Sequence, residues 1–453
     1  MADSICAIST YPQNAAIGIV RASGPGVLEM AGQLFVSRDP SYPPFPRGRL
    51  VVGSITLLTR GRQIPECLLA CFPGPRSYTG EDVCEFQVPG NVLLLGEIME
   101  ELVRLGCRPA EKGEFTRRAW ENGRMDLPAA EMLNELIRAR TREGMLLAAS
   151  QMDGALSRRI AAMRQELVDL ITCLEAVIEF GETEGVALDR AAMIERSGRL
   201  AAELNELARS FSAVRSLREG CRVVIAGKAN VGKSSLFNYL AGTPRAIVHD
   251  VPGTTRDVLR ETVEIGGVTM TLHDTAGFRA GVVDGVEGEG QRRSQTAMAG
   301  CDGMIVVVDG SAPLEEPDRS VVAAARAKRS MVIVNKIDLG RHPECRVDTL
   351  VPTIEVSALV GTNCEGIGPL IERVFRGESP AEGPMVMTLR QKRCLGRAGE
   401  AARRAVAGLE AGQAEEIVAE ELRASAVGMS ELIGEVSPQE VVDRIFAGFC
   451  VGK

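Results

Sequence analysis

Aromatic side chains are scarce in this chain, and long apolar runs are missing from it. Phenylalanine, tyrosine and tryptophan together make up 4% of the 453 residues, which disfavours a base-stacking platform built from several aromatics. No stretch of eighteen or more uncharged apolar residues occurs, so the sequence predicts no transmembrane helix and no membrane insertion. The N-terminal residues carry neither the basic nor the apolar region of a secretory signal, and we therefore expect a cytoplasmic protein.

An excess of positive charge is also missing. The chain has 52 Lys and Arg residues against 60 Asp and Glu residues, and the net charge of −8 excludes a globally basic coat for nucleic acid. A local basic face is still compatible with this balance. None of the twelve cysteines shows the paired C-x-x-C spacing of a zinc site, so we interpret most of them as small buried apolar residues. Cys450, close to the C-terminus, is the exception that we consider separately.

Length and composition indicate several domains. At roughly 150 residues per domain, a chain of 453 residues suggests three. Between Leu156 and Val177 the apolar residues recur with a mean period of 3.5, which is typical of a long helix packed against another helix. Helical periodicity on both sides of an α/β unit suggests that this unit is inserted into a helical domain. The predicted segments are an α+β domain at 1–118, a first helical part at 119–216, an α/β unit at 217–378 and a second helical part at 379–453.

The central segment has the pattern of a mostly parallel sheet. Its apolar runs at 222–226, 303–309 and 331–335 are nearly continuous and rich in β-branched residues, as expected for strands that are covered on both faces. Gly266-Gly267 separates two further apolar segments and predicts a two-residue hairpin. The sequence therefore predicts one antiparallel pair added to a parallel sheet.

A phosphate-binding motif follows the first of these strands. The segment Gly227-Lys228-Ala229-Asn230-Val231-Gly232-Lys233-Ser234 fits G-x-x-x-x-G-K-[ST] and precedes a helical pattern, which is the context that the motif requires. Its glycines allow the backbone to wrap around phosphates, and the helix N-terminus then faces the anion. We expect Lys233 to reach the β- and γ-phosphates and Ser234 to bind Mg²⁺.

Three short motifs come later, in a fixed order, each at the end of a strand. In Asp274-Thr275-Ala276-Gly277 the carboxylate can hold Mg²⁺ through water, and the glycine amide can contact a γ-phosphate. In Asn335-Lys336-Ile337-Asp338 the last carboxylate can accept hydrogen bonds from N1–H and the 2-amino group of guanine, which adenine lacks. Ser357-Ala358-Leu359 would support the base at O6. Together with the phosphate-binding loop, these motifs predict a GTPase.

The loop before Asp274 holds the expected first switch. Thr255, in Gly253-Thr254-Thr255-Arg256-Asp257, is the candidate second Mg²⁺ ligand. The residue after Asp-Thr-Ala-Gly is Phe278, so the water-positioning glutamine of Ras-like enzymes is missing. Asn230 lies where its carbonyl, with switch-loop carbonyls, could hold a monovalent cation such as K⁺ in place of an arginine finger.

This set of motifs resembles the MnmE (TrmE) family of tRNA-modification GTPases. The run 72–82, FPGPRSYTGED, is similar to that family's F-P-G-P-x-S-[YF]-T-G-E-D, and 113–119, GEFTRRA, is similar to its G-E-F-T-x-R-A. The run 122–127, NGRMDL, resembles N-G-K-L-D-L, and the chain ends in the family's F-C-[IV]-G-K. The resemblance covers the whole length.

The family resemblance implies more than GTP hydrolysis. It implies an N-terminal domain that binds folate and forms a homodimer, and GTP hydrolysis that depends on K⁺ and on dimerisation of the GTPase domain. It implies an FAD-dependent partner, the MnmG (GidA) protein, in a heterotetramer-type complex. Together the two proteins would modify C5 of the wobble uridine, position 34, of certain tRNAs. The one-carbon unit would come from 5,10-methylenetetrahydrofolate or a 5-formyltetrahydrofolate-type ligand.

The resemblance also assigns roles to individual residues. The K⁺ shell corresponds to Asn230, the carbonyls of His249 and Val251, and Thr254, and the Mg²⁺ ligands to Ser234 and Thr255. The catalytic residues correspond to Glu287, which would orient water, Lys233 and Cys450, and the folate-binding residues to Arg21, Glu81, Arg124 and Lys453. The expected GTP-binding residues are Asn230, Val231, Gly232, Lys233, Ser234, Ser235, His249, Asp250, Val251, Pro252, Gly253, Thr254, Thr255, Asp274, Thr275, Ala276, Gly277, Asn335, Lys336, Asp338, Ser357, Ala358 and Leu359.

Cys450 and two rival functions complete the expectations. Lys453 lies close enough in sequence for its ammonium to favour a thiolate at Cys450, whereas a small buried residue or a dispensable tail is the alternative. A ribosome-assembly GTPase switch would share the GTPase motifs but would need a KH-like G-x-x-G or a tandem GTPase domain, and neither is visible. A folate-binding scaffold whose GTPase domain only gates dimerisation is the second rival.

Overall fold

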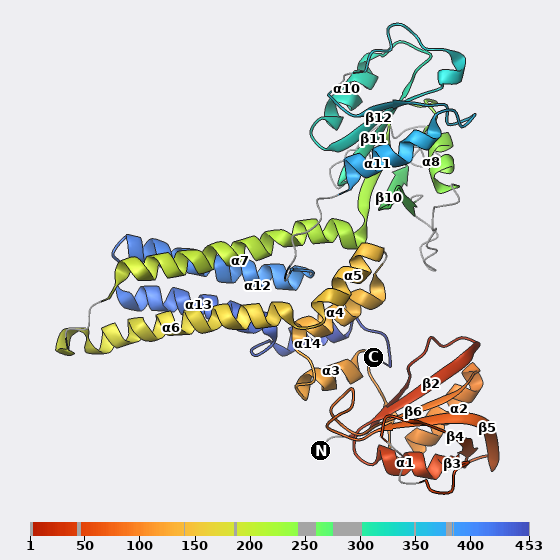
Figure 1. Cartoon of the computed structure of the whole chain (residues 1–453), viewed down its shortest axis with the longest axis vertical. Coiled ribbons are helices and arrows are strands. Elements are labelled where there is room, and N and C mark those ends of the chain that lie inside the picture. Colours follow the sequence, from red (N-terminus) through yellow and green to blue (C-terminus); the bar gives the residue numbers. More distant parts are fainter. Residues whose placement is uncertain are drawn as a thin grey trace, which may run out of the picture. The chain divides into compact units, whose positions relative to one another are not determined.

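The structure is a computed structural model that describes residues 3–42, 47–139, 141–184, 188–242, 260–274, 301–347, 350–376, 383 and 385–452 (Figure 1). The chain divides into two compact units. The first consists of Met1–Arg138, Ala148–Arg209 and Gly383–Lys453, and the second consists of Ala139–Leu147 and Ser210–Glu382. The second unit thus lies between segments of the first in sequence, as expected for an inserted unit.

The N-terminal part of the first unit is built on a seven-stranded sheet with the order β3-β4-β5-β6-β2-β1-β7. Neighbouring strands are antiparallel except β1 and β7, which are parallel. The strands are β1 (Ile5–Ile8), β2 (Ala15–Ser23), β3 (Phe35–Ser37), β4 (Leu50–Leu57), β5 (Arg62–Phe72), β6 (Val83–Gly90) and β7 (Arg108–Pro109). Two helices, α1 (Val27–Leu34) and α2 (Val92–Arg104), join this sheet in one apolar core that includes Leu34, Leu69, Phe86, Leu95 and Ile98. The predicted α+β domain is confirmed.

The other face of this sheet is exposed at β4. Leu50, Ala70, Glu85 and Arg21 lie directly across from one another on β4, β5, β6 and β2. Because side chains alternate between the two faces of a strand, Val52 shares this face with Leu50. Val52 is 41% exposed and Leu50 is 56% exposed, so apolar side chains of this face meet solvent in the single chain.

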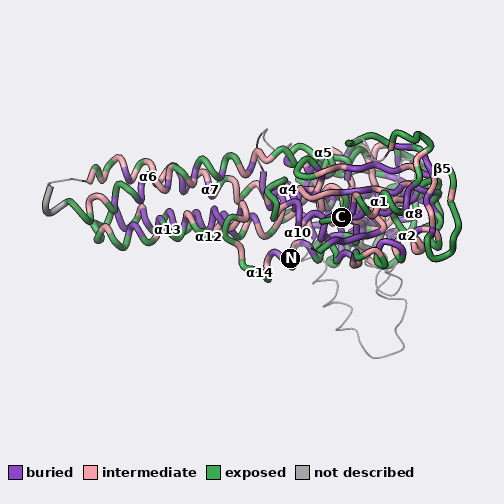
Figure 2. The backbone as a smooth tube through the Cα atoms, turned by 90° about the horizontal axis from the view of Figure 1, so that it is seen from below, coloured by how far each residue is buried: buried purple, intermediate pink, exposed green. Residues whose placement is uncertain are grey.

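Four long helices form a bundle that lies largely in the first unit (Figure 1). Two come before the inserted unit and two after it: α6 (Ala155–Glu184), α7 (Arg190–Glu219), α12 (Leu389–Glu410) and α13 (Glu415–Ile433). In Figure 2 the buried stretches recur regularly along these helices. The seam predicted from period 3.5 is confirmed, because Leu156, Ile160, Leu167 and Leu174 are buried. Ion pairs such as Arg159–Glu203 and Arg423–Glu175 join neighbouring helices at the surface.

Shorter helices follow the N-terminal sheet and end the chain. They are α3 (Glu114–Glu121), α4 (Leu127–Arg138), α5 (Arg142–Gln151) and α14 (Gln439–Phe446). An apolar cluster of Leu127, Ala130, Val442, Phe446 and Phe449 packs α4 against the C-terminal segment. The first helices after the sheet and the last residues of the chain are therefore parts of one core.

The second unit contains a six-stranded sheet with the order β13-β12-β11-β8-β10-β9. All neighbouring strands are parallel except β9 and β10, the predicted antiparallel pair, whose turn residues Gly266 and Gly267 have φ of 59° and 73°. The strands are β8 (Cys221–Ala226), β9 (Arg260–Ile265), β10 (Val268–Asp274), β11 (Gly303–Asp309), β12 (Arg329–Asn335) and β13 (Thr353–Glu355).

Apolar cores lie on both faces of this sheet. Ile225, Ile305 and Ile333 point into the core with α8 (Lys233–Ala241) and α11 (Ile367–Phe375), whereas Val306 and Val332 point into the core with α10 (Glu316–Ala325). This two-sided burial is the physical reason for the continuous apolar runs. None of the described helices is both long and apolar enough to cross a lipid bilayer.

Candidate functional site

The predicted nucleotide motifs meet at one edge of the six-stranded sheet. Strands β8, β10, β11, β12 and β13 are parallel, so their carboxyl ends share this edge. The phosphate-binding loop follows β8, Asp274 is the last residue of β10, and Asn335 is the last residue of β12. Ligands of open α/β sheets bind at this kind of edge.

Two glycines of the phosphate-binding loop are required by close backbone approach. Gly227 has a φ of 150°, and a Cβ atom there would lie 2.2 Å from the carbonyl oxygen of Val307. Gly232 has a φ of 98°, and its Cβ would lie 2.1 Å from Nδ2 of Asn335. Between them Asn230 has a left-handed φ of 63°. The loop is therefore a narrow backbone cradle of the kind that surrounds phosphates.

Lys233 occupies the interior of this cradle. It is the first residue of α8 and is only 8% exposed. Its Nζ donates hydrogen bonds to the carbonyl oxygens of Gly227, at 2.9 Å, and Lys228. Ser234 and Ser235 follow in the first turn of the helix and are exposed. The ammonium and the helix N-terminus thus supply positive charge at the mouth of the loop.

Asn335 joins the phosphate-binding loop to the motifs that are predicted to bind the base. Its Nδ2 donates to the carbonyl oxygen of Val231 at 2.9 Å, and its Oδ1 accepts from the backbone N–H of Ala358 at 2.9 Å. Lys336 has a φ of 67° and contacts Asp309 at 2.6 Å. These contacts join the phosphate-binding loop to the ends of β11 and β12 and to the loop after β13.

The residues expected to read the base differ in exposure. Asp338 lies on the surface, in the short 3₁₀ turn η2 (Ile337–Leu339), where its carboxylate is accessible to a ligand. Ser357 is fully buried and Ala358 is 8% exposed, whereas Leu359 is 82% exposed. The backbone of the Ser-Ala-Leu motif is therefore anchored, and its last side chain is open to solvent.

Several predicted site residues lie outside the described residues. These are His249, Asp250, Val251, Pro252, Gly253, Thr254 and Thr255 of the first switch, Thr275, Ala276 and Gly277 of the second, and Glu287 and Lys453. Their roles stay predictions.

The predicted folate residues lie in the N-terminal part of the first unit. Arg21 on β2 donates from Nε to Oε1 of Glu85 at 2.8 Å, and its guanidinium lies 5.5 Å and 5.7 Å from the ring centres of Tyr78 and Phe115. Glu81 accepts a hydrogen bond from Oγ of Ser23 at 2.8 Å. Arg124 donates to the carbonyl oxygen of Ser77 at 3.1 Å, so it contacts the 77–81 loop, of which Glu81 is the last residue.

The C-terminal tail docks beside Arg21. Val451 pairs with Lys112 in an isolated antiparallel bridge, and the carbonyl oxygen of Gly452 accepts from Ser9 at 3.3 Å and from Arg21 at 3.4 Å. Gly452 has a φ of 94°, and a Cβ there would lie 2.5 Å from the carbonyl oxygen of Ile8. The docking therefore requires glycine at this position.

The C-terminal tail also carries a solvent-exposed thiol, that of Cys450. Ten of the twelve cysteines are buried, which confirms the interpretation of most of them as small core residues, and only Cys173 and Cys450 are exposed. The alternative of a buried Cys450 is thereby wrong.

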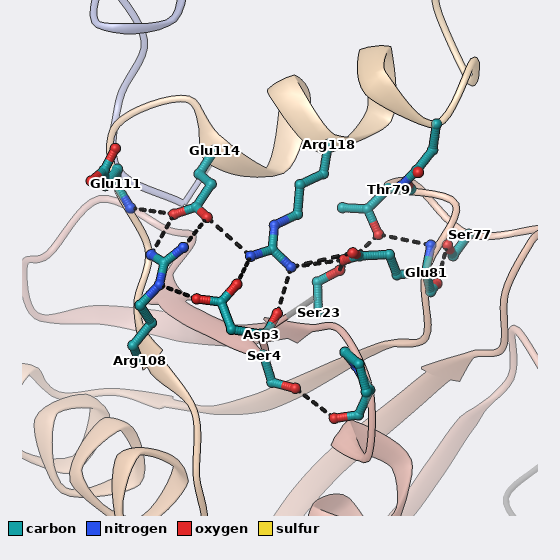
Figure 3. A network of polar contacts seen from close by, with 12 residues as sticks. Asp3, Ser4, Ser23, Ser77, Thr79, Glu81, Arg108, Glu111, Glu114 and Arg118 are labelled. Atoms are coloured by element: carbon teal, nitrogen blue, oxygen red, sulfur yellow. Dashed lines mark hydrogen bonds and ion pairs between the residues drawn. The ribbon is translucent and has the colours of Figure 1, made fainter. Parts of the chain in front are cut away.

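Sequence reasoning missed the charged network around Glu81. Arg118 on α3 donates from Nη1 to both carboxylate oxygens of Glu81, at 3.3 Å and 3.1 Å (Figure 3). The same guanidinium contacts Asp3 and Glu114, and Arg108 contacts both of these acids as well. A signal for Arg118 was present: in the family's G-E-F-T-x-R-A, Arg118 stands at the fixed arginine and Arg117 at the variable position, but the motif does not say what that arginine contacts.

Comparisons with known proteins show which family the chain belongs to. Residues 4–124 match the family model described as "GTP-binding protein TrmE N-terminus", and residues 127–450 match the one described as "MnmE helical domain". The relative from Geobacter sulfurreducens named "tRNA modification GTPase MnmE" is 38% identical over 458 residues, which cover 100% of this chain and 99% of the relative. The chain belongs to the MnmE family.

A second relative and a solved structure also match this chain. The protein of the same name from Symbiobacterium thermophilum is also 38% identical, with 100% of this chain and 99% of that protein covered. Among solved structures, the G domain of the T. maritima FeoB iron transporter matches with 22% identity and a TM-score of 0.25, covering 34% of this chain and 98% of its own. Full-length membership of the MnmE family makes the protein a GTPase that acts in tRNA modification.

The geometry of the cradle fits this activity. GTP binds to a GTPase of this type with Mg²⁺, and the glycine-lined loop with Lys233 inside it offers the amides and the charge that its phosphates need. The carbonyl oxygens of Gly227 and Lys228 accept hydrogen bonds from Lys233, so its ammonium lies within the loop.

The network beside Glu81 predicts a pH-dependent stability. Burial would raise the pKa of Glu114, but hydrogen bonds from Arg108, the backbone N–H of Glu111 and Arg118 outweigh it and lower that pKa from its ordinary value of 4.5. A lowered pKa stabilises the fold above the unfolded-state value, and the stabilisation is lost as the pH falls through the folded-state value. Glu114→Gln should therefore reduce the free energy of unfolding at neutral pH by about 1–3 kcal/mol.

Urea unfolding between about pH 3 and pH 6 checks this. The Glu114→Gln variant should lose less stability than the natural protein over that range, because the titrating group is gone. Glu121→Gln is the matched control on the same helix, where a half-exposed acid pairs with Arg117. Equal pH slopes for Glu114→Gln and the natural protein would contradict the assigned role of Glu114.

Proposed function

We propose that this GTPase works with an FAD-dependent partner of the MnmG (GidA) kind, in the cytoplasm, and modifies C5 of the wobble uridine, position 34, of certain tRNAs. Its one-carbon unit would come from 5,10-methylenetetrahydrofolate or a 5-formyltetrahydrofolate-type ligand. The observation that carries the proposal is the convergence of Arg21, Glu81 and the docked tail residue Gly452 in one region of the first unit, although they are up to 431 residues apart.

The chemistry of this region suits a folate. A pterin ring presents paired N–H donors, which the oxygens of a carboxylate such as that of Glu81 can accept. Arg21 lies over two aromatic rings and beside the carbonyl oxygen of Gly452, next to the predicted position of Lys453. Arg21, Arg124 and Lys453 would balance the glutamate tail of the ligand. We propose Cys450, the exposed thiol on the same tail, as a residue active in the modification.

We further propose that K⁺ completes the charge neutralisation of GTP. The left-handed backbone of Asn230, with a φ of 63°, lies in the phosphate-binding loop at the position that the family resemblance assigns to the ion. The other proposed K⁺ ligands are the carbonyls of His249 and Val251, and Thr254. Ser234 and Thr255 are the proposed Mg²⁺ ligands, and Glu287 is the proposed water-orienting residue.

Homodimerisation through the N-terminal domain is part of the proposal. Leu50 and Val52 expose 56% and 41% of their surface at β4, on one face of the seven-stranded sheet. Exposed apolar patches of this kind mark protein interfaces, and a second copy of this chain offers a matching face. The proposed domain division remains 1–118, 119–216, 217–378 and 379–453.

Analysis of wobble nucleosides tests the function. A strain deleted for this gene should lack the C5-substituted uridine in total tRNA hydrolysates, and the natural protein should restore it. Cys450→Ser should fail to restore the nucleoside. Cys173→Ser, a change of the other exposed thiol, should restore it fully.

Two results would sink parts of this proposal. Unchanged wobble nucleosides in the deletion strain would remove the modification role and favour a ribosome-assembly switch. Full restoration by Cys450→Ser would leave the modification role in place but would remove Cys450 from its chemistry.

A further inference from the structure

The carboxylate of Glu81 is held from one side by a single buried guanidinium. Nη1 of Arg118 lies 3.3 Å from Oε1 and 3.1 Å from Oε2 of Glu81, and the side chain of Arg118 is only 9% exposed. We propose that Arg118 is a positioning residue, which fixes the carboxylate of Glu81 in the orientation that accepts the N–H donors of a pterin ring. The inference rests on the proposed folate function and names a residue that acts on the ligand through Glu81.

Arg118 is itself held in a single arrangement. Its Nη1 donates to the carbonyl oxygen of Asp3 at 2.7 Å, and its Nη2 donates to Oδ1 of Asp3 at 2.7 Å and to Oε1 of Glu114 at 3.0 Å (Figure 3). Arg108 holds both acids from their other side, with 2.9 Å and 2.6 Å contacts to Glu114. The guanidinium therefore cannot change rotamer without breaking several charge-assisted hydrogen bonds.

The charge of Arg118 is secured by the same contacts. Burial alone would lower the pKa of its guanidinium, but hydrogen bonds and charge from Glu81 and Glu114 outweigh burial and raise that pKa. This positive charge faces the carboxylate of Glu81. An ionised carboxylate accepts hydrogen bonds only, which is what a ring with paired N–H donors requires.

The opposite side of Glu81 is fixed by neutral groups. Oγ of Ser23 donates to Oε2 at 2.8 Å and lies 2.7 Å from Oγ1 of Thr79, which in turn accepts from the backbone N–H of Glu81 at 3.2 Å. Within the described residues, Oε1 of Glu81 receives a contact from Arg118 alone. A carboxylate oxygen has about two acceptor directions, so Oε1 keeps capacity for a ligand donor.

The arrangement needs the fork of an arginine. One guanidinium spans a backbone carbonyl oxygen and three carboxylates, which lie in different directions around a plane. A lysine ammonium is a point charge with three donors on a flexible stem, so it could keep the charge beside Glu81 but not all of the contacts. Arg118→Lys should therefore retain part of the positioning, and Arg118→Gln should lose it.

Calorimetric titration of the full-length protein with 5-formyltetrahydrofolate tests the inference. Arg118→Gln should weaken binding roughly tenfold or more, and Arg118→Lys should weaken it less. Arg117→Gln is the matched control, because this neighbouring arginine on α3 pairs with Glu121 and Asp443. Its affinity should equal that of the natural protein.

A double-mutant cycle separates positioning from general support of the fold. In a Glu81→Ala background, adding Arg118→Gln should change the dissociation constant for 5-formyltetrahydrofolate by less than about twofold. The reason is that Arg118 acts through the carboxylate that this background lacks. If Arg118→Gln does not fold, the same cycle is measured with Arg118→Lys. Thermal unfolding midpoints identify variants that are merely destabilised.

Each outcome decides between the claims. Unaltered affinity in both Arg118 variants would overturn the inference, and so would effects of Arg118 and Glu81 changes that simply add. Absence of binding by the natural protein would instead overturn the proposed folate donor, and with it the role of Arg118.

Discussion

Asp338→Asn should abolish tight GTP binding and make the protein accept xanthosine triphosphate. The carboxylate of Asp338 lies at the surface just after β12, where it can accept from N1–H and the 2-amino group of guanine. An amide in its place offers an N–H where the base has a second N–H, so two charge-assisted hydrogen bonds are lost. GTP affinity should fall by roughly a hundredfold or more. Xanthine carries a carbonyl at C2, which the new amide can satisfy.

Competition binding with GTP, ATP and xanthosine triphosphate measures this switch. Glu344→Gln is a suitable control, since it removes the same charge from another exposed acid of the same unit. The control should bind GTP as the natural protein does. Unaltered GTP affinity in Asp338→Asn would show that the base pocket lies elsewhere.

Lys233→Ala should reduce single-turnover GTP hydrolysis by about a hundredfold or more. The ammonium of Lys233 sits inside the loop cradle, 2.9 Å from the carbonyl oxygen of Gly227, and would neutralise charge on the β- and γ-phosphates. The negative charge on the phosphates grows in the transition state. Loss of the lysine ammonium should therefore lower the rate of GTP hydrolysis more than the affinity for GTP.

The second lysine of the loop provides the control. Nζ of Lys228 points to α10, where it contacts Glu315 and, at 3.1 Å, Asp318. Lys228→Ala should therefore reduce GTP turnover much less than Lys233→Ala.

The dependence of turnover on the monovalent cation is a separate prediction. The natural protein should hydrolyse GTP faster in K⁺ buffer than in Na⁺ buffer. Equal losses in the two lysine variants would argue against the special role of Lys233, and equal rates in the two salts would remove the K⁺ proposal.

Local patterns account for what could be predicted. Strands β8, β11 and β12 are buried on both faces, so each is a continuous apolar run in the sequence. Such a strand can be predicted without knowing which strands lie beside it. The phosphate-binding loop is likewise a local device, in which Gly227, Gly232 and Lys233 act within eight residues. The apolar seam of α6 could be predicted because residues that recur with a period of 3.5 lie along one buried side of a helix.

Contacts between distant segments could not be predicted in the same way. Asn335 was expected to bind nucleotide, but its bonds to Val231 and Ala358 depend on the order of β8, β12 and β13 in the sheet. The docking of Gly452 against Ile8 depends on a β-bridge across most of the chain. Such contacts follow from strand order and side-chain direction, which no short pattern records.

The sequence by itself determined the family, the glycines and lysine of the phosphate-binding loop and the continuous apolar strands, because each of these patterns depends on neighbours in sequence. Only the tertiary structure decided that Arg118 contacts Glu81 while Arg117 pairs with Glu121, since the motif marks the arginine at 118 but not its partners. The reason is geometric: the two arginines are successive residues on α3, so they lie about 100° apart around the helix, and only one of them can face Asp3, Glu114 and Glu81.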